Sequence, residues 1–280
     1  MVMRSVKAAR VIGMLVIASG RVWAQTAGIT LQIRPHVNDT LRMRLDQQTE
    51  MTGVRRTTAG EVTAIVVNTM KMFSRAIVEG ASEKGTNLLA VTDSVLLTTT
   101  DDLARAAAQR AELELRGKQM RFRVSWDGTV GMNESEPGAS REVAQVVSLM
   151  PAAFPKAAIK LGESWIREVA LPPSQQFGAQ LPGKLHITFR LDSLTHGGDW
   201  AFVSMRGELK PVAVPPANSG ATLERGTVNG TMLVDQKRGW LTESWFTIVT
   251  ISVITPPLMT GIGATHVQMR ITQHMHTERR

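Results

Sequence analysis

The sequence predicts a mainly β protein with a minor α+β character, built as a long-stranded curved antiparallel sheet or half-barrel with one or two helices against it. From Gly183 to His276, apolar and polar residues alternate with the two-residue period of β-strands, which indicates four or five strands. Two earlier runs, 61–79 and 86–98, are apolar at both odd and even positions. Strands of about 10–15 residues would reach about 33–50 Å, and sheets of such strands twist and curl.

The first half of the chain predicts strands on either side of a helix. Leu41, Met43 and Leu45 alternate with charged residues, as in a half-buried strand. After the two doubly apolar runs, Thr100 and the acids that follow it favour a helix start, and an Ala-rich run extends that helix over about 101–112. The alternation over 120–126 and the turn at 127–128 then predict a β-hairpin.

A second helix is predicted over 140–150. Ser140 can cap it, and Pro151 ends it. Val143, Val146, Val147 and Met150 form an apolar stripe, which is usually a core face. The alternative is a movable lid over a cavity.

The domain organisation follows these elements. Residues 1–24 are the predicted signal peptide, 25–150 an N-terminal β half with both helices, 151–182 a Pro-rich connection, and 183–280 a C-terminal antiparallel β meander. Turns are predicted in the last part at 196–199 and 235–239. Whether the chain forms one domain or two stays open.

The N-terminus has the pattern of a secretory signal. Arg4, Lys7 and Arg10 precede a short apolar run, and a cleavage site is expected near Ala24–Gln25. The run is too short for a stable membrane span, so we expect no transmembrane segment in the mature chain and a periplasmic or secreted location. A short membrane anchor is the alternative.

Composition narrows the functional classes. Removing the signal peptide takes the net charge from +8 to +4, as 28 basic and 24 acidic residues remain. Those charges are scattered and the chain has no Tyr, which argues against a nucleic-acid partner. The chain has no Cys, which excludes disulfides, thiolate metal sites and cysteine nucleophiles.

The segment Lys160-Leu161-Gly162-Glu163-Ser164-Trp165 resembles the "VGDSW"-type motif of uncharacterised secreted bacterial β-rich proteins. That resemblance implies no known activity. The predicted layout is also similar to that of bacterial periplasmic lipoprotein carriers, half-barrels with helices across the concave face, where acyl chains bind. This second likeness is one of fold, and a fold does not confer function.

Motifs of four enzyme classes are absent from the sequence. There is no G-x-S-x-G elbow, because Gly162-Glu163-Ser164-Trp165-Ile166 lacks the closing Gly. There is also no H-E-x-x-H helix, P-loop or dinucleotide-binding motif. We therefore predict a non-enzymatic protein without a cofactor, and a hydrolase is the less favoured alternative.

Two kinds of binding site remain as candidates. His274 and His276 lie at i and i+2 of a strand, so their imidazoles share one face and could bind a metal; solvated histidines are the alternative. An apolar ligand site is predicted where strands are apolar on both faces and the second helix can cover them. Its candidate residues are Val66, Met70, Met72, Leu89, Val91, Val143 and Val147.

The sequence thus favours an exported envelope protein that binds or carries a lipid, an acyl chain or a lipoprotein. The alternative is a structural or interaction module with a solid core, whose surface for an envelope protein partner would lie on loops 211–222 and 255–263.

Overall fold

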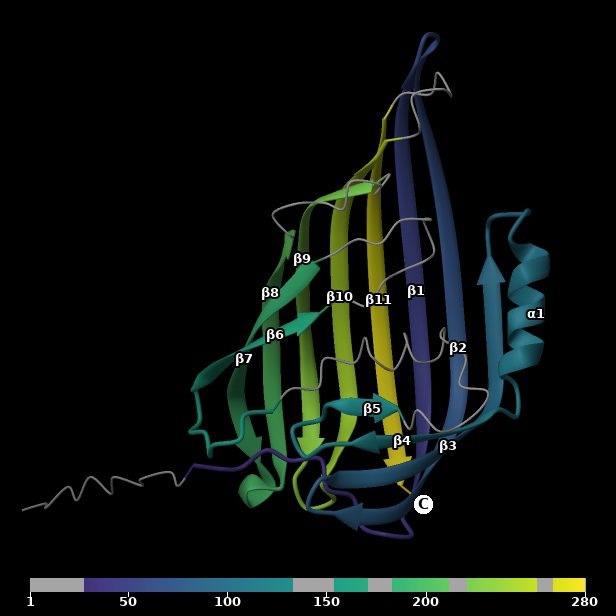
Figure 1. The fold of residues 1–280 in the computed structure, drawn as a ribbon. Helices are drawn as coiled ribbons and strands as arrows, with labels where there is room; N and C mark the ends of the chain where they lie inside the picture. Colours follow the sequence, from purple (N-terminus) through teal and green to yellow (C-terminus); the bar gives the residue numbers. More distant parts are fainter. Residues whose placement is uncertain (1–27, 133–153, 171–182, 212–220, 256–263, 280) are drawn as a thin grey trace, which may run out of the picture.

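The computed structural model describes residues 28–132, 154–170, 183–211, 221–255 and 264–279. Its strands form a single antiparallel sheet of eleven strands in the order β5-β4-β3-β2-β1-β11-β10-β9-β8-β7-β6 (Figure 1). The elements are β1 (Thr40–Thr57), β2 (Gly60–Ser82), β3 (Gly85–Thr99), α1 (Arg105–Leu115), β4 (Gln119–Val124), β5 (Val130–Met132), β6 (Ser164–Ala170), β7 (Gly183–Thr195), the 3-10 turn η2 (His196–Gly198), β8 (Trp200–Pro211), β9 (Ala221–Asp235), β10 (Trp240–Ile254) and β11 (Thr265–Arg279).

The sheet consists of two meanders joined by the first and last strands. Every hydrogen-bonded pair links strands that are consecutive in sequence, except β1 and β11. These two strands pair over almost their whole length, from Leu41 opposite Arg279 to Arg55 opposite Thr265. The two predicted halves therefore share one continuous sheet. The stretch predicted as a Pro-rich connection contains β6 in its described part, paired with β7.

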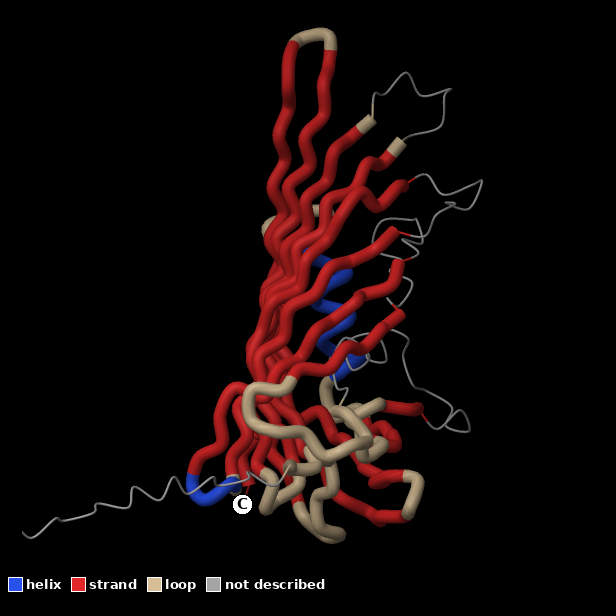
Figure 2. Tube along the Cα trace, turned by 90° about the vertical axis from the view of Figure 1, so that its left-hand side faces the viewer, coloured by secondary structure: helices blue, strands red, loops and turns tan. Residues whose placement is uncertain are grey.

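The predicted fold class is confirmed: the protein is mainly β, and its sheet is curved, with β5 and β6 as open edges. Figure 2 shows the curvature from the side, with the strands bending at one end of the molecule. The predicted turns also form, since Asp235 pairs with Trp240 across the β9–β10 turn, and Ser125 donates to the carbonyl of Thr129 across the turn at 127–128.

α1 starts a few residues later than the predicted helix. The Thr99 hydroxyl accepts a hydrogen bond from the Asp101 N–H, and the Asp101 carboxylate accepts one from the Leu103 N–H. These local bonds hold the chain in a turn before the helix begins at Arg105. The predicted helix 140–150 lies outside the described residues.

α1 protects an exposed sheet edge. Because β4 pairs only with the part of β3 from Thr86 to Val91, the rest of that edge has no strand beside it. The helix lies along this edge (Figure 1), and the Glu112 carboxylate accepts a hydrogen bond from the Leu97 N–H of β3 at 3.3 Å. Capping an edge in this way reduces its tendency to pair with another chain.

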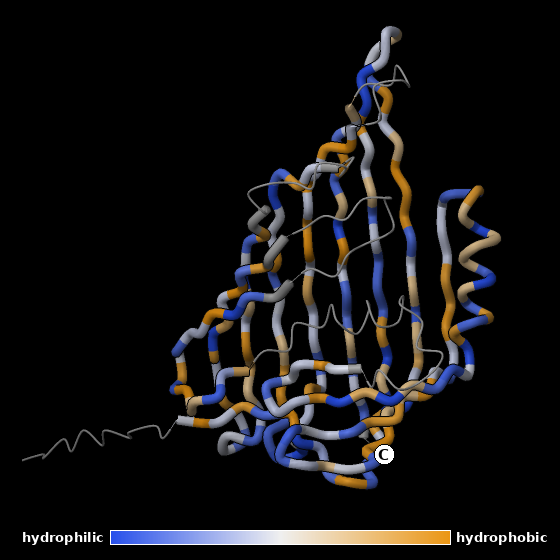
Figure 3. The backbone as a smooth tube through the Cα atoms, in the orientation of Figure 1, coloured by the Kyte–Doolittle hydropathy of each residue, from blue (hydrophilic) through white to orange (hydrophobic). Residues whose placement is uncertain are grey.

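Side chains alternate between two unlike faces of the sheet. The inner face is the one that carries the buried core and over which β4 and β5 bend (Figures 1 and 2). Figure 3 shows the resulting alternation of hydrophobic and hydrophilic residues along the long strands. The largest fully buried hydrophobic side chains in the described part are Leu31, Leu45, Val78, Leu88, Phe154, Ile187, Phe189, Leu191, Val203, Met205 and Val228.

Two non-strand segments close one end of this core. Leu31 and Phe154, each 1% exposed, belong to the segments 28–39 and 154–163. The segments are tied together by a β-bridge between Ile29 and Ile159. Segment 28–39 is also tied to the end of the sheet, because the backbone N–H of Arg34 donates a hydrogen bond to the carbonyl of Gly239 at 2.7 Å. Within the described residues, no helix combines the length and apolarity needed to cross a membrane.

Candidate functional site

Among the described residues, an incompletely covered apolar area lies on the inner face of β1, β2, β3 and β11. We name it the inner patch. Its members are half-buried, and strand pairing places them together: Met51 lies opposite Val66 on one side and Met269 on the other. The inner patch consists of Met51, Val66, Met70, Leu97, Met269 and Ile271.

Burial along β2 shows how this area opens. On the inner face, every second residue from Val78 to Met72 is buried. From Met70 to Val66 the inner residues are half-buried, and at Val62 half of the side chain is exposed. The inward row of β2, which is mostly apolar but includes Ser74 and Asn68, therefore runs from a closed core to an open end.

Three methionines give the inner patch an adaptable surface. Met51, Met70 and Met269 have unbranched, flexible thioether side chains, which fit irregular apolar shapes. An apolar area of this kind that is left partly open in a folded chain is typical of an interaction or ligand site. The arrangement can therefore bind an apolar group by shape and dispersion.

Two glutamines stand at one end of the inner patch. Gln47 and Gln273 are direct partners across β1 and β11, so their side chains project from the same face. Gln47 also lies opposite Met70, and Gln273 opposite Phe246. They form a polar spot in an otherwise mostly apolar row of side chains.

The residues predicted for an apolar site fall into three groups. Val66 and Met70 are members of the inner patch, and Met72 lies next to Met70 along the same face, in the core. Leu89 and Val91 lie on the opposite, outer face. Val143 and Val147 are outside the described residues.

A β-bulge helps to explain why β3 has apolar residues at both odd and even positions. The β2–β3 register shifts between Phe73 and Ser74, whose partners are Ser94 and Thr92. Asp93 is the extra residue. Before it, even-numbered residues such as Leu88 face inward, and after it, odd-numbered residues such as Val95 face inward. Apolar residues at both parities in 86–98 therefore come partly from this bulge.

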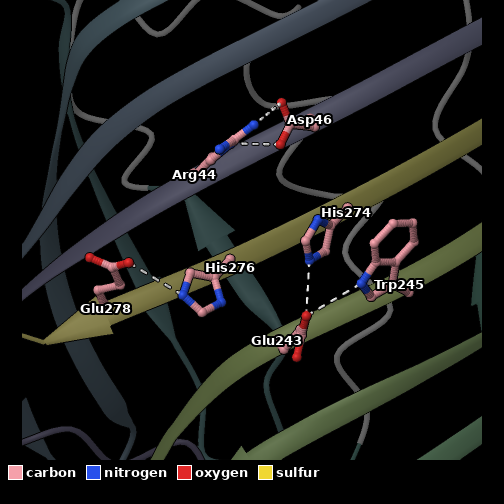
Figure 4. Close-up of polar contacts among 7 residues, drawn as sticks. All are labelled: Arg44, Asp46, Glu243, Trp245, His274, His276 and Glu278. Atoms are coloured by element: carbon pink, nitrogen blue, oxygen red, sulfur yellow. Dashed lines mark hydrogen bonds and ion pairs between the residues drawn. The ribbon is translucent and has the colours of Figure 1, made fainter.

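The outer face carries the histidines in a polar cluster (Figure 4). His274 and the Glu243 carboxylate are 3.1 Å apart, and the Trp245 indole N–H donates to the same carboxylate at 3.4 Å. The rings of Trp245 and His274 stack with centroids 4.0 Å apart. His276 instead pairs with Glu278 at 3.5 Å.

This cluster differs from the predicted metal site. His274 and His276 share the outer face, as expected for i and i+2, but each contacts its own carboxylate. Among the described residues, no group of three or more His, Asp and Glu side chains is arranged to hold a metal ion. An open hollow of about 360 Å³ adjoins the cluster; it is lined by Trp200, Leu233, Arg238, Thr242, Glu243, His276, Thr277 and Glu278.

The segment 160–165 builds a turn into β6. Gly162 adopts a positive φ of 81°, and the Glu163 carboxylate accepts the Lys160 N–H at 2.8 Å. Trp165 then stacks on the buried ring of Phe189, with centroids 5.5 Å apart. The glycine, acid and tryptophan of this segment thus each have a structural role in attaching β6 to β7.

Gly162→Ala is therefore expected to destabilise the fold by about 1–2 kcal/mol, because an L side chain is strained at this φ. Urea unfolding with Gly53→Ala as control measures this. Gly53 has no positive φ, and a Cβ there would meet its nearest neighbour at an ordinary 3.7 Å. Equal midpoints for the two variants would contradict the assigned role.

Comparison with known proteins gives a likeness of fold. No protein-family model matches the chain, and no curated protein matches it. A solved structure described as "lipid-protein interactions in lipovitellin" is similar with a TM-score of 0.50 and 11% identity. The similarity covers 88% of this chain and 25% of that one, so this chain spans a quarter of the lipovitellin chain. The outer membrane protein OprG from Pseudomonas aeruginosa aligns over 89% of this chain and 100% of its own, with 8% identity and a TM-score of 0.22.

Proposed function

We propose that this protein is an exported, non-enzymatic protein that binds a lipid or acyl chain on its inner patch. The observation that carries the proposal is the mostly apolar inner face, which is closed at one end and half-exposed over Met51, Val66 and Met70. A ligand lying there would cover apolar surface that the described residues leave in contact with solvent. Each Å² removed from water would contribute about 25 cal/mol.

Two further observations support the proposal. The lipovitellin structure, which has a similar fold, is described by its lipid–protein interactions, and binding of an acyl chain would be a related use of a curved sheet. The N-terminal basic and apolar segments favour export, after cleavage near Ala24–Gln25, to the periplasm or the outside of the cell.

The test is to purify the protein from cells that export it, extract it with organic solvent, and analyse the extract by mass spectrometry. We expect a lipid in stoichiometric amount. A parallel purification of a β-rich exported protein without a partly exposed apolar patch controls for lipid carried over from the envelope. A protein that contains no lipid, and that takes up none from vesicles, would refute the proposal.

A further inference from the structure

Two side-chain carbonyl oxygens in the interior have no hydrogen-bond donor. Gln47 Oε1 and Gln273 Oε1 are both inaccessible to solvent, and within the described part of the chain neither accepts a hydrogen bond. The whole Gln273 side chain is buried, with 1% of the residue exposed. Because Gln47 and Gln273 are cross-strand partners, the two acceptors belong to one spot on the inner face.

Such a pair is unusual in a folded protein. Almost all buried polar atoms have a partner, and a buried acceptor without a donor destabilises the fold. Leucine or methionine would fill the same positions without this cost, as the neighbouring Leu45 and Met275 do one step along each strand. The two amides therefore fit a bound group that supplies the missing donors.

The local contacts favour an uncharged group. The Gln47 amide N–H donates to the Thr49 hydroxyl at 3.5 Å, which leaves the carbonyl oxygen as its free end. The cross-strand neighbours of the glutamines, Met70 and Phe246, are uncharged. A charged head group would be buried there without a counter-ion, at a high desolvation cost.

We propose that the two glutamines bind the head of a single-chain amphiphile whose polar end is a neutral hydrogen-bond donor, a hydroxyl or an amide N–H. The inference rests on the proposed function and names its ligand class. The chain would lie over Met51, Val66 and Met269 towards the open end of the β1–β2 hairpin. From Gln47 to Arg55 this path is eight residues, or about 26 Å of strand.

The test compares three ligands that share one chain length. Hexadecan-1-ol, hexadecane and hexadecanoate are titrated into the delipidated full-length protein, and binding is measured by calorimetry or equilibrium partition. We expect the alcohol to bind about tenfold more tightly than the alkane, because only the alcohol satisfies the buried acceptors. The carboxylate should also bind more weakly than the alcohol.

The variant Gln47→Leu/Gln273→Leu should lose this preference and bind alcohol and alkane within about twofold of each other. Gln47→Leu alone serves if the double variant does not fold. Gln48→Leu is the matched control, because Gln48 is the adjacent exposed residue on the outer face, and it should keep the wild-type preference.

The outcomes separate this inference from the function on which it rests. If no ligand binds to the wild type, the proposed function itself fails. If alcohol and alkane bind equally to the wild type, the lipid site stands, and the assignment of a donor head group to the two amides is overturned. A preference for the alcohol that survives in the double variant would place the head group elsewhere and overturn the assignment to Gln47 and Gln273.

Discussion

Gly230→Ala is expected to destabilise the protein by about 3 kcal/mol or more. Gly230 lies on the inner face of β9, between Met205 of β8 and Phe246 of β10. A Cβ at this position would lie 2.3 Å from the carbonyl oxygen of Trp245 and 2.7 Å from the Cβ of Phe246. Both contacts are with atoms on or next to the backbone of the central strand β10. The clash can therefore be relieved only if the paired backbones of β9 and β10 move apart, which places the free-energy cost at the upper end of the usual range for overpacking.

Two other inward glycines share this feature. A Cβ at Gly207 would lie 2.5 Å from the carbonyl oxygen of His186, and one at Gly226 would lie 2.8 Å from Leu209. Glycines at such places allow strands to coil and approach closely, which gives a sheet its curvature. The glycines of β8 and β9 therefore help to make the inner face concave.

The control for this prediction is Gly80→Ala. Gly80 is also a strand glycine without a positive φ, but a Cβ there would have no heavy atom within 4 Å. This substitution should change the stability by less than about 1 kcal/mol, and in the stabilising direction, because it restricts the unfolded chain. Urea unfolding followed by tryptophan fluorescence measures both variants. Similar midpoints would show that the close approach at Gly230 relaxes easily.

The sequence predicts the strands well because the alternation of apolar and polar residues depends only on local geometry. Leu185, Ile187 and Phe189 all face inward as predicted from their spacing. The pairing of β1 with β11 could not be predicted in the same way. It joins residues more than 200 positions apart, and no local pattern specifies which strand lies beside β1.

The candidate site was predicted less completely, for two physical reasons. The bulge at Asp93 inverts the alternation within β3, so Leu89 and Val91 lie on the face opposite Val66. Gln47 and Gln273 carry a sequence signal that the apolar pattern alone overlooks. Each is a polar residue at an inward position of its strand, where Leu45 and Met275 are the neighbouring inward residues.

The two faces of the sheet have different uses in this structure. Outer side chains are joined in ion pairs such as Arg75–Asp93 at 2.8 Å and Arg44–Asp46 at 2.7 Å, which satisfy their charges on the surface. Exposed pairs of this kind contribute little to stability. The inner face carries the core at one end and the inner patch at the other, so the proposed lipid site adjoins the residues that stabilise the fold.

Val66→Asp is expected to remove most of the bound lipid, lowering the amount that copurifies by at least about tenfold. Val66 lies at the centre of the apolar end of the inner patch, opposite Met51. A carboxylate there must either lose its water when an acyl chain covers it or hold the chain away from the sheet. A tenfold loss of binding corresponds to about 1.4 kcal/mol, and we expect either outcome to exceed that free energy. Because Val66 is only half-buried in the free protein, the fold itself should tolerate the change.

The matched control is Ile65→Asp, which places the same charge one residue away on the outer face. Ile65 is 59% exposed and lies opposite Thr52, so its carboxylate would stay in water and face no cross-strand acid. Lipid content should then match the wild type, as measured by extraction and mass spectrometry, with circular dichroism confirming that both variants fold. Equal loss in both variants would mean that the hairpin end as a whole, rather than its inner face, determines lipid binding. Full retention in Val66→Asp would place the ligand away from the inner patch.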